Sequence, residues 1–97
     1  MIDDDGGFDS YEHDEMPYTL ALLDLRYELQ RARSLHPDLR SAHEGYAVIL
    51  EELDELWDHV RTKQSERDLD AMRVEAIQIA TTAIRFAAEC CRETGLH

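Results

Sequence analysis

The sequence predicts an all-α protein, a helical bundle of three main helices that is completed by homo-oligomerisation. Only four glycines and two prolines occur among its 97 residues, so little of the chain is suited to turns. Apolar residues recur at intervals of three and four along three segments, the spacing that places side chains on one face of a helix. A single domain of this length has a small core, and a partner chain would enlarge it.

The charge is unevenly distributed. The formal net charge is −12, and seven of the 22 acidic residues lie within residues 1–16, where no Lys or Arg occurs. That segment has too little apolar surface to offset the entropy lost on ordering, so we expect a flexible acidic leader (1–16) before a helical domain (17–97). From residue 17 onward fifteen acids face ten bases. An acidic surface repels nucleic acid and anionic membranes, so we expect no direct binding to either.

The two cysteines, Cys90 and Cys91, are adjacent. This spacing suits neither a metal knuckle nor a disulfide framework, and it favours a reducing, cytoplasmic setting. The chain does not begin with a basic segment followed by an apolar run, and it has no stretch of about eighteen apolar residues. Export and membrane insertion are therefore not expected.

The first helix is expected over residues 17–35. Pro17 suits its first turn, because the missing N–H would have no partner there. The helix should end before Pro37, since a proline disfavours helical geometry in the residue before it. Its apolar positions are Tyr18, Leu22, Leu25, Leu29 and Ala32.

The second helix is expected to begin near Ser41 and to run to residue 60. Ser41 and Glu44 have the spacing of a capping box, in which each side chain accepts a free backbone N–H at the helix start. The expected buried stripe consists of Tyr46, Ile49, Leu50, Leu53, Trp57 and Val60.

The third helix is expected to begin around Ser65, which is followed by Asp68 three residues on, and to be capped by Gly95. Such a helix would be on the order of 40 Å long and would outrun its neighbours. We therefore expect a second subunit to cover part of it. Its apolar positions are Leu69, Met72, Ala76, Ile79, Ala80, Ala83, Phe86, Ala87 and Cys90.

Some of the acids should face inward rather than toward water. At about 100° per residue, Glu51 and Asp58 fall on the far side of the second helix from its stripe. Glu52 and Glu55 instead share a face with Val48 and His59, which suggests a second, partly buried surface. On the third helix, Glu75 and Gln78 flank the apolar stripe one turn apart. Antiparallel packing of the two helices would bring together Glu52, Glu55, Glu75 and Gln78.

Three carboxylates in one place need neutralising. Each close pair would repel by roughly 4 kcal/mol at an effective dielectric of 20. The carboxylates must therefore be protonated, pushed apart or paired with a cation. A cluster that offers only oxygen atoms suits Mg²⁺ or Mn²⁺, which bind through a few carboxylates together with the phosphates of a substrate.

These residues resemble a known motif. The pattern E-E-x-x-E on one helix, followed by E-x-x-D on the next, is similar to that of the MazG-like group within the all-α nucleoside triphosphate pyrophosphohydrolases. Here the two halves read EELDE (residues 51–55) and EAIQ (residues 75–78). The resemblance covers roughly residues 20 to 93, including the lead-in HEGYAVILEE and the run EAIQIATTAIRF.

The resemblance implies hydrolysis of a nucleoside triphosphate, NTP or dNTP, to the monophosphate and pyrophosphate. It also implies that Glu52, Glu55 and Glu75 hold one or two Mg²⁺ ions, with Glu51 in a supporting part. Gln78 departs from the motif, which has Asp there. An amide oxygen coordinates Mg²⁺ but brings no charge and accepts no proton, so the resemblance leaves open an active enzyme with an altered site and a slow, nucleotide-binding relative.

Other residues have both a functional and a plain interpretation. His43, His59 and Arg85 would serve as phosphate contacts or as solvated polar residues. One of the aromatic residues would stack on a base, or all would pack in the core. The whole chain has two rival interpretations as well. One is a non-enzymatic, acidic interaction protein that binds a basic partner, even as a nucleic-acid mimic, and the other is a purely structural bundle.

Overall fold

The computed structural model describes residues 7–92, which form only helices and connecting turns. This confirms the predicted all-α class for that part of the chain. A 3₁₀ turn precedes the third helix, and a π-helical turn follows it without a break. The elements are α1 (Gly7–Leu35), α2 (Ala42–Val60), η1 (Gln64–Glu66), α3 (Leu69–Arg85) and η2 (Phe86–Cys90).

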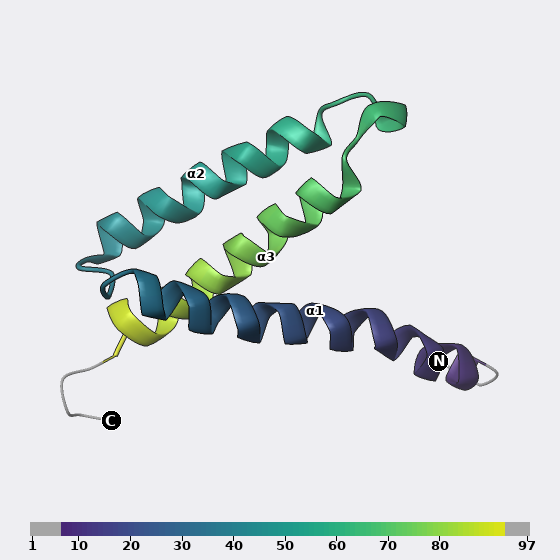
Figure 1. Cartoon of the computed structure of the whole chain (residues 1–97), viewed down its shortest axis with the longest axis horizontal. Helices are drawn as coiled ribbons and strands as arrows, with labels where there is room; N and C mark the ends of the chain where they lie inside the picture. Colours follow the sequence, from purple (N-terminus) through teal and green to yellow (C-terminus); the bar gives the residue numbers. More distant parts are fainter. Residues whose placement is uncertain (1–6, 93–97) are drawn as a thin grey trace.

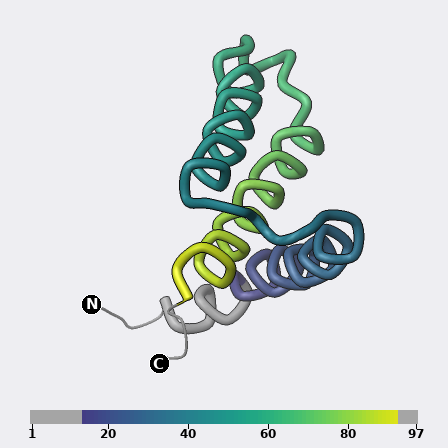
Figure 2. The backbone as a smooth tube through the Cα atoms, turned by 90° about the vertical axis from the view of Figure 1, so that its left-hand side faces the viewer, coloured from purple at the N-terminus to yellow at the C-terminus, as the bar shows by residue number. Residues whose placement is uncertain are grey.

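The central element is α3, which packs against both other helices. With α2 it forms an antiparallel hairpin, and α1 crosses near the opposite end of α3 from the turn of that hairpin (Figure 1). The view from the side shows α1 running beneath the hairpin rather than alongside α2 (Figure 2). The helices α1 and α2 therefore share α3 as their common packing partner.

The first helix begins earlier than expected. It starts at Gly7, so Pro17 lies inside the helix and the predicted start at Pro17 is wrong. A proline in a helix removes one backbone hydrogen bond, but Glu15 and Met16 just before it are strong helix formers. Residues 1–6 of the expected leader lie outside the described residues, residues 7–16 are helical, and the division into a leader and a domain stays a prediction.

The start of α2 is confirmed. Ser41 is the N-cap, and its hydroxyl accepts the Glu44 N–H at 3.0 Å. The Glu44 carboxylate accepts the Arg40 N–H at 2.6 Å, one residue before the partner that a capping box predicts. Local chemistry at the cap therefore positions the first turn of α2.

The start of α3 differs from the prediction at Ser65. Its N-cap is Asp68, whose carboxylate accepts the Ala71 N–H at 3.0 Å. Arg67 donates two hydrogen bonds to the carbonyl of Val60, the last residue of α2, at 2.6 and 3.1 Å. The backbone of Arg67 is extended, so the helix does not begin before Asp68. With the π-helical turn that continues it, the helix spans residues 69–90, roughly 33 Å, rather than the expected length of about 40 Å. Gly95 lies outside the described residues.

The interior of the single chain is mostly polar. Within the described residues, Ala32 is the one buried hydrophobic residue, whereas Thr81, Thr82 and Arg85 are all buried. The radius of gyration is 17.0 Å, against about 12.5 Å for a compact chain of this length. The chain by itself has little apolar core.

The expected buried stripe of α2 is wrong for most of its members. Tyr46 and Trp57 are 63% and 58% exposed, and Leu50 and Leu53 are exposed as well. The periodicity correctly identified an apolar face, but it could not show that no part of the same chain covers that face. Apolar residues of the other helices are exposed too, including Leu22 on α1 and Leu69 at the start of α3. The face of α2 that turns inward carries Gly45, Val48, Glu52, Leu56 and His59.

Gly45 allows α2 to approach the end of α3. A Cβ atom at this position would lie 2.5 Å from Cδ2 of Phe86, which is closer than real carbon atoms approach. The absence of a side chain at residue 45 therefore sets how near the first turn of α2 comes to η2.

A buried ion pair fastens the α1–α2 connection to α3. Arg85 Nε donates to Glu89 at 3.0 Å, and both side chains are more than 90% buried. Arg85 also donates to the Pro37 carbonyl at 2.7 Å, and Glu89 accepts the Leu39 N–H at 2.7 Å. Burial opposes ionisation of Glu89, but these hydrogen bonds lower its pKa. Arg85 is therefore not the solvated side chain that its sequence position suggested.

Replacement of Arg85 should destabilise the fold strongly. In Arg85→Ala the Glu89 carboxylate would remain buried without its cation, and we expect a loss of about 3–5 kcal/mol in the free energy of unfolding. Urea unfolding at one protein concentration measures this loss. The matched control is Arg61→Ala, which breaks the exposed pair with Asp58 and should cost about 1 kcal/mol or less. Equal losses in the two variants would contradict the structural role of Arg85.

Candidate functional site

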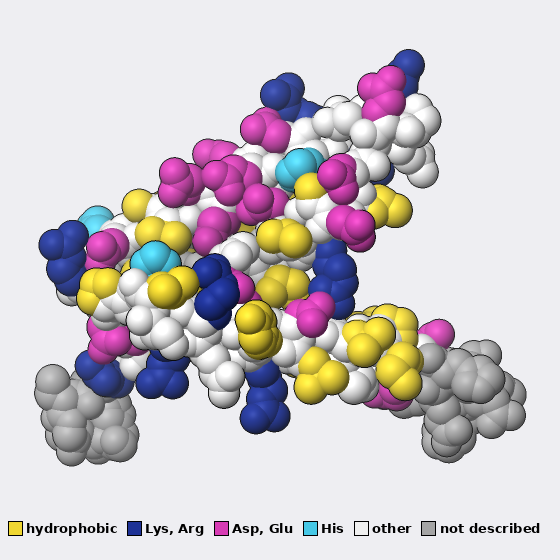
Figure 3. Space-filling model, in the orientation of Figure 1, with side chains coloured by type: hydrophobic (Ala, Val, Ile, Leu, Met, Phe, Trp, Pro, Cys, Tyr) yellow, Lys and Arg dark blue, Asp and Glu magenta, His cyan; other side chains and the backbone are white. Residues whose placement is uncertain are grey.

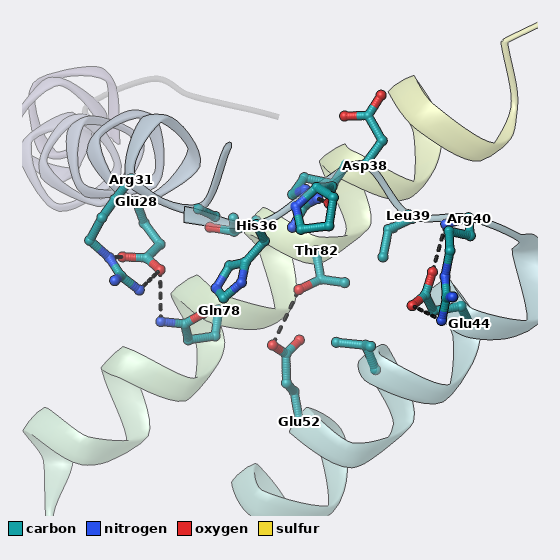
Figure 4. Close-up of a pocket in the computed structure, with 15 residues that line it drawn as sticks. Glu28, Arg31, His36, Asp38, Leu39, Arg40, Glu44, Glu52, Gln78 and Thr82 are labelled. Atoms are coloured by element: carbon teal, nitrogen blue, oxygen red, sulfur yellow. Dashed lines mark hydrogen bonds and ion pairs between the residues drawn. The ribbon is translucent and has the colours of Figure 1, made fainter. Parts of the chain in front are cut away.

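A cavity of about 470 Å³ lies where α1, the α1–α2 connection, α2 and α3 meet (Figure 4). Its walls combine apolar surface with charged side chains of both signs. The site residues Glu52 and Gln78 line it from facing helices, together with Glu28, Arg31, His36, Arg40, Glu44, Thr82 and Arg85.

Glu52 is half-buried on the inward face of α2. Its Oε2 accepts a hydrogen bond from the Thr82 hydroxyl at 3.2 Å, whereas its Oε1 is buried with no partner among the described residues. Burial raises the pKa of Glu52, the Thr82 hydrogen bond opposes this, and the nearby charges of Glu75 and Glu55 raise it further. A buried carboxylate oxygen without a partner is costly unless a proton or a cation satisfies it.

Glu75 faces Glu55 across the α2–α3 hairpin. Burial raises the pKa of Glu75, and so does the negative charge of Glu55, while His59 lowers it. Glu55 itself is exposed one turn beyond Glu52 on α2, a helix over which acidic side chains gather in a strip (Figure 3). The charges of Glu55 and Glu75 therefore act on Glu52, and the charge of Glu55 acts on Glu75.

Gln78 lies one turn along α3 but turns toward α1. Its Nε2 donates to Oε2 of Glu28 at 2.9 Å. Glu28 in turn accepts two hydrogen bonds from Arg31, at 2.9 and 2.7 Å, and these bonds are the main cause of a lowered Glu28 pKa. Gln78 therefore shares the cavity with Glu52 while its amide nitrogen is engaged elsewhere.

Glu28 is not among the site residues predicted from the sequence, although its position in the first helix is unusual for a charged residue. Glu28 falls between Leu25, Leu29 and Ala32, so it lies on the apolar face of its helix rather than on the solvent face. A charged residue at such a position is often paired or functional. Its actual partner, Gln78, lies 50 residues away in the sequence.

The other candidates have mixed outcomes. His43 is exposed and does not line the cavity, and His59 is half-buried beside Glu75. Arg85 lines the cavity, but its guanidinium is engaged by Glu89 and Pro37. None of the aromatic residues in the described part of the chain lines this cavity.

The described acidic side chains do not form a coordination sphere for a metal ion. Among the side chains that the structure describes, those of residues 14–92, no three His, Cys, Asp or Glu residues surround a single point from which an ion would contact all of them. The donor set nevertheless fits a hard divalent cation, since it offers carboxylate and amide oxygens and one buried oxygen without a partner.

A scan against protein-family models and searches of curated proteins and of solved structures each find no match to this chain. The likeness to the MazG-like group therefore rests on the motif residues themselves.

The acid cluster should make the metal-free fold less stable as the pH rises. Glu52 and Glu75 have folded-state pKa values above the ordinary 4.5, so the folded chain binds more protons than the unfolded chain. Stability is then highest below pH 4.5 as far as these groups are concerned, and it falls until the pH passes the raised pKa values.

Glu52→Gln should remove part of this loss. With chelator present, we expect its melting temperature to exceed that of the wild type by a few degrees at pH 7 and to match it more closely near pH 4.5. Thermal unfolding between pH 4.5 and 8 measures the difference. Glu51→Gln, on the exposed face, is the control and should follow the wild type. A wild-type stability that rises across this range, relative to Glu52→Gln, would contradict the assignment.

Proposed function

We propose that this chain is a Mg²⁺-dependent nucleoside triphosphate pyrophosphohydrolase, with Mn²⁺ as a possible substitute. The observation that carries the proposal is the pair of half-buried carboxylates, Glu52 and Glu75, on facing helices. Both have raised pKa values, and Glu52 has a buried oxygen without a partner. Such an arrangement is unfavourable in the absence of a cation, and the motif that it forms is the one that resembles the MazG-like group.

Glu52, Glu55, Glu75 and the Gln78 carbonyl oxygen are the residues that would hold the metal. When bound, Mg²⁺ supplies charge neutralisation for the triphosphate and lowers the pKa of a bound water. Thr82 fixes the orientation of the Glu52 carboxylate. Glu55 is exposed, and its carboxylate would accept a proton from an attacking water, a task for which the neutral amide of Gln78 is unsuited.

The cavity beside these residues has room for a nucleotide-sized ligand, because small-molecule sites generally measure about 300–1,000 Å³. Its volume is about 470 Å³, and Arg31, His36 and Arg40 are among the residues that line it. In this proposal, water breaks the anhydride bond between the α and β phosphates and yields the monophosphate and pyrophosphate.

We also propose that the active protein is a homodimer or a higher homo-oligomer. The support is the exposed apolar stripe on α2, formed by Tyr46, Leu50, Leu53 and Trp57, and the open shape of the single chain. Exposed apolar patches of this kind mark interaction surfaces. The sequence predicts an interface on the third helix. The exposed stripe indicates that α2 takes part in the interface as well.

A second candidate function follows from the acidic strip on α2 (Figure 3). Glu51, Asp54 and Asp58 are all exposed there, and a surface of one sign attracts a basic partner. Binding of that kind would be sensitive to salt and independent of divalent ions.

A cytoplasmic location stays a prediction. Within residues 7–92, no helix combines the length and apolar character needed to cross a bilayer.

The central test is product analysis with each common NTP and dNTP, in Mg²⁺, in Mn²⁺ and in chelator. We expect monophosphate and pyrophosphate with the metal and neither with chelator. Glu52→Ala should lower the rate at least about 100-fold, because a lost metal ligand removes several kcal/mol of transition-state stabilisation. Asp54→Ala, an exposed acid on the same helix, is the matched control and should keep nearly full activity.

No turnover in the wild type, together with a salt-sensitive complex with a basic protein, would favour the interaction protein. Retained activity in Glu52→Ala would show that the reaction takes place at another site.

The oligomer is tested separately with Trp57→Glu. A charge within the exposed stripe should convert the assembly to monomers, because desolvating it opposes association. Light scattering after size-exclusion chromatography gives the mass. Lys63→Glu, in the exposed α2–α3 connection, is the control and should leave the mass unchanged. A wild-type protein that runs as a monomer would contradict the proposal.

A further inference from the structure

Three side chains from two helices form a continuous chain of hydrogen bonds beside the acid cluster. Arg31 donates to both oxygens of Glu28, and Glu28 accepts the Nε2 hydrogen of Gln78 at 2.9 Å. The Glu28 side chain in the pair with Arg31 is only 13% exposed. The close-up shows the amide nitrogen of Gln78 turned toward Glu28 and away from Thr82 and Glu52 (Figure 4).

The chemistry of these groups fixes which end of the Gln78 amide points where. An ionised carboxylate has acceptors only, so it binds the NH₂ group of an amide and not the carbonyl oxygen. The bidentate contact with Arg31 holds Glu28 in its ionised form and in one orientation. As long as Glu28 is present and ionised, Nε2 of Gln78 is therefore engaged by α1, and Oε1 is the atom left for a cation.

The same arrangement explains why an amide suits position 78. An aspartate or glutamate there would place a second carboxylate against Glu28, and the two would repel each other. The neutral amide instead satisfies Glu28 with its nitrogen and keeps an oxygen for coordination. The departure from the motif at Gln78 is in this way matched to an acid on a different helix.

We propose that Glu28 is a positioning residue that orients the Gln78 amide so that Oε1 faces the metal-binding carboxylates. This inference rests on the proposed function, because it assigns Gln78 Oε1 to the same metal site. Glu28 itself does not contact the metal, and Arg31 supports it by holding its carboxylate in place.

The orientation is tested without any metal by NMR of side-chain amides. The chain contains three glutamines and no asparagine, so its spectrum should hold only three side-chain NH₂ pairs. Gln30 and Gln64 are exposed, whereas Gln78 is half-buried. Gln78→Glu identifies the third pair by its loss.

In Glu28→Ala we expect the Gln78 pair to move to the shifts and fast hydrogen exchange of the two exposed glutamines. The matched control is Asp24→Ala, which breaks another contact between α1 and α3, the 2.6 Å bond from Arg73, and does not touch Gln78. It should leave the Gln78 pair in place. An unchanged Gln78 pair in Glu28→Ala would overturn the proposal.

The second test is a double-mutant cycle on Mn²⁺ affinity, measured by the paramagnetic resonance of free Mn²⁺. Glu28→Ala should weaken binding about tenfold in the wild-type background, as expected for a residue that orients a ligand. In the Gln78→Ala background the same change should have almost no effect, since the oriented group is gone.

Equal weakening in both backgrounds would show that Glu28 binds the metal directly or acts through the fold, and would overturn the inference while leaving the proposed metal site intact. A wild-type protein that binds no Mn²⁺ would overturn the proposed function, and the role of Glu28 with it.

Discussion

The buried pair of Arg85 and Glu89 is the interaction on which the rest of the structure depends. It ties the connection between α1 and α2 to the end of α3 through the Pro37 carbonyl and the Leu39 N–H. Without that attachment, the position of α1 relative to α2 would not be fixed, since each of these helices packs mainly on α3. The cavity exists because these two helices are held apart on the same central helix.

A polar interior is stable only when its groups are paired, and most of this one is. Thr81 bonds the Ile77 carbonyl of its own helix, and Thr82 bonds Glu52. The exception is Oε1 of Glu52, in a protein whose other buried side-chain polar atoms in the described residues all have partners. Buried polar atoms without a partner are commonly found where a ligand binds, and the stability that they cost is then offset by function.

Local and periodic features could be predicted from the sequence, whereas features that depend on distant contacts could not. The cap at Ser41 was predictable because the cap and its partner lie three residues apart. The inward positions of Glu52 and Glu75 followed from the angle between residues on a helix. The start of α3 was not predictable, because Ser65 and Asp68 are both good caps and the choice depends on Arg67 reaching back to Val60. Glu28 was missed because its contact with Gln78 depends on how α1 crosses α3. The metal, the reaction and the oligomer stay predictions.

Gly45 has a consequence for how such a site can change over time. It lies seven residues before Glu52, about 10 Å along α2, and its missing side chain sets how closely that helix approaches Phe86. A methyl group there would collide with the Phe86 ring, so either the ring or the first turn of α2 would have to move. In the proposed metal site, a shift of α2 would change the spacing between Glu52 and Glu75 although neither residue is touched. Mutation at residue 45, which cannot itself bind an ion, would then change the ion preference of that proposed site, at a position that a comparison of site residues alone would overlook.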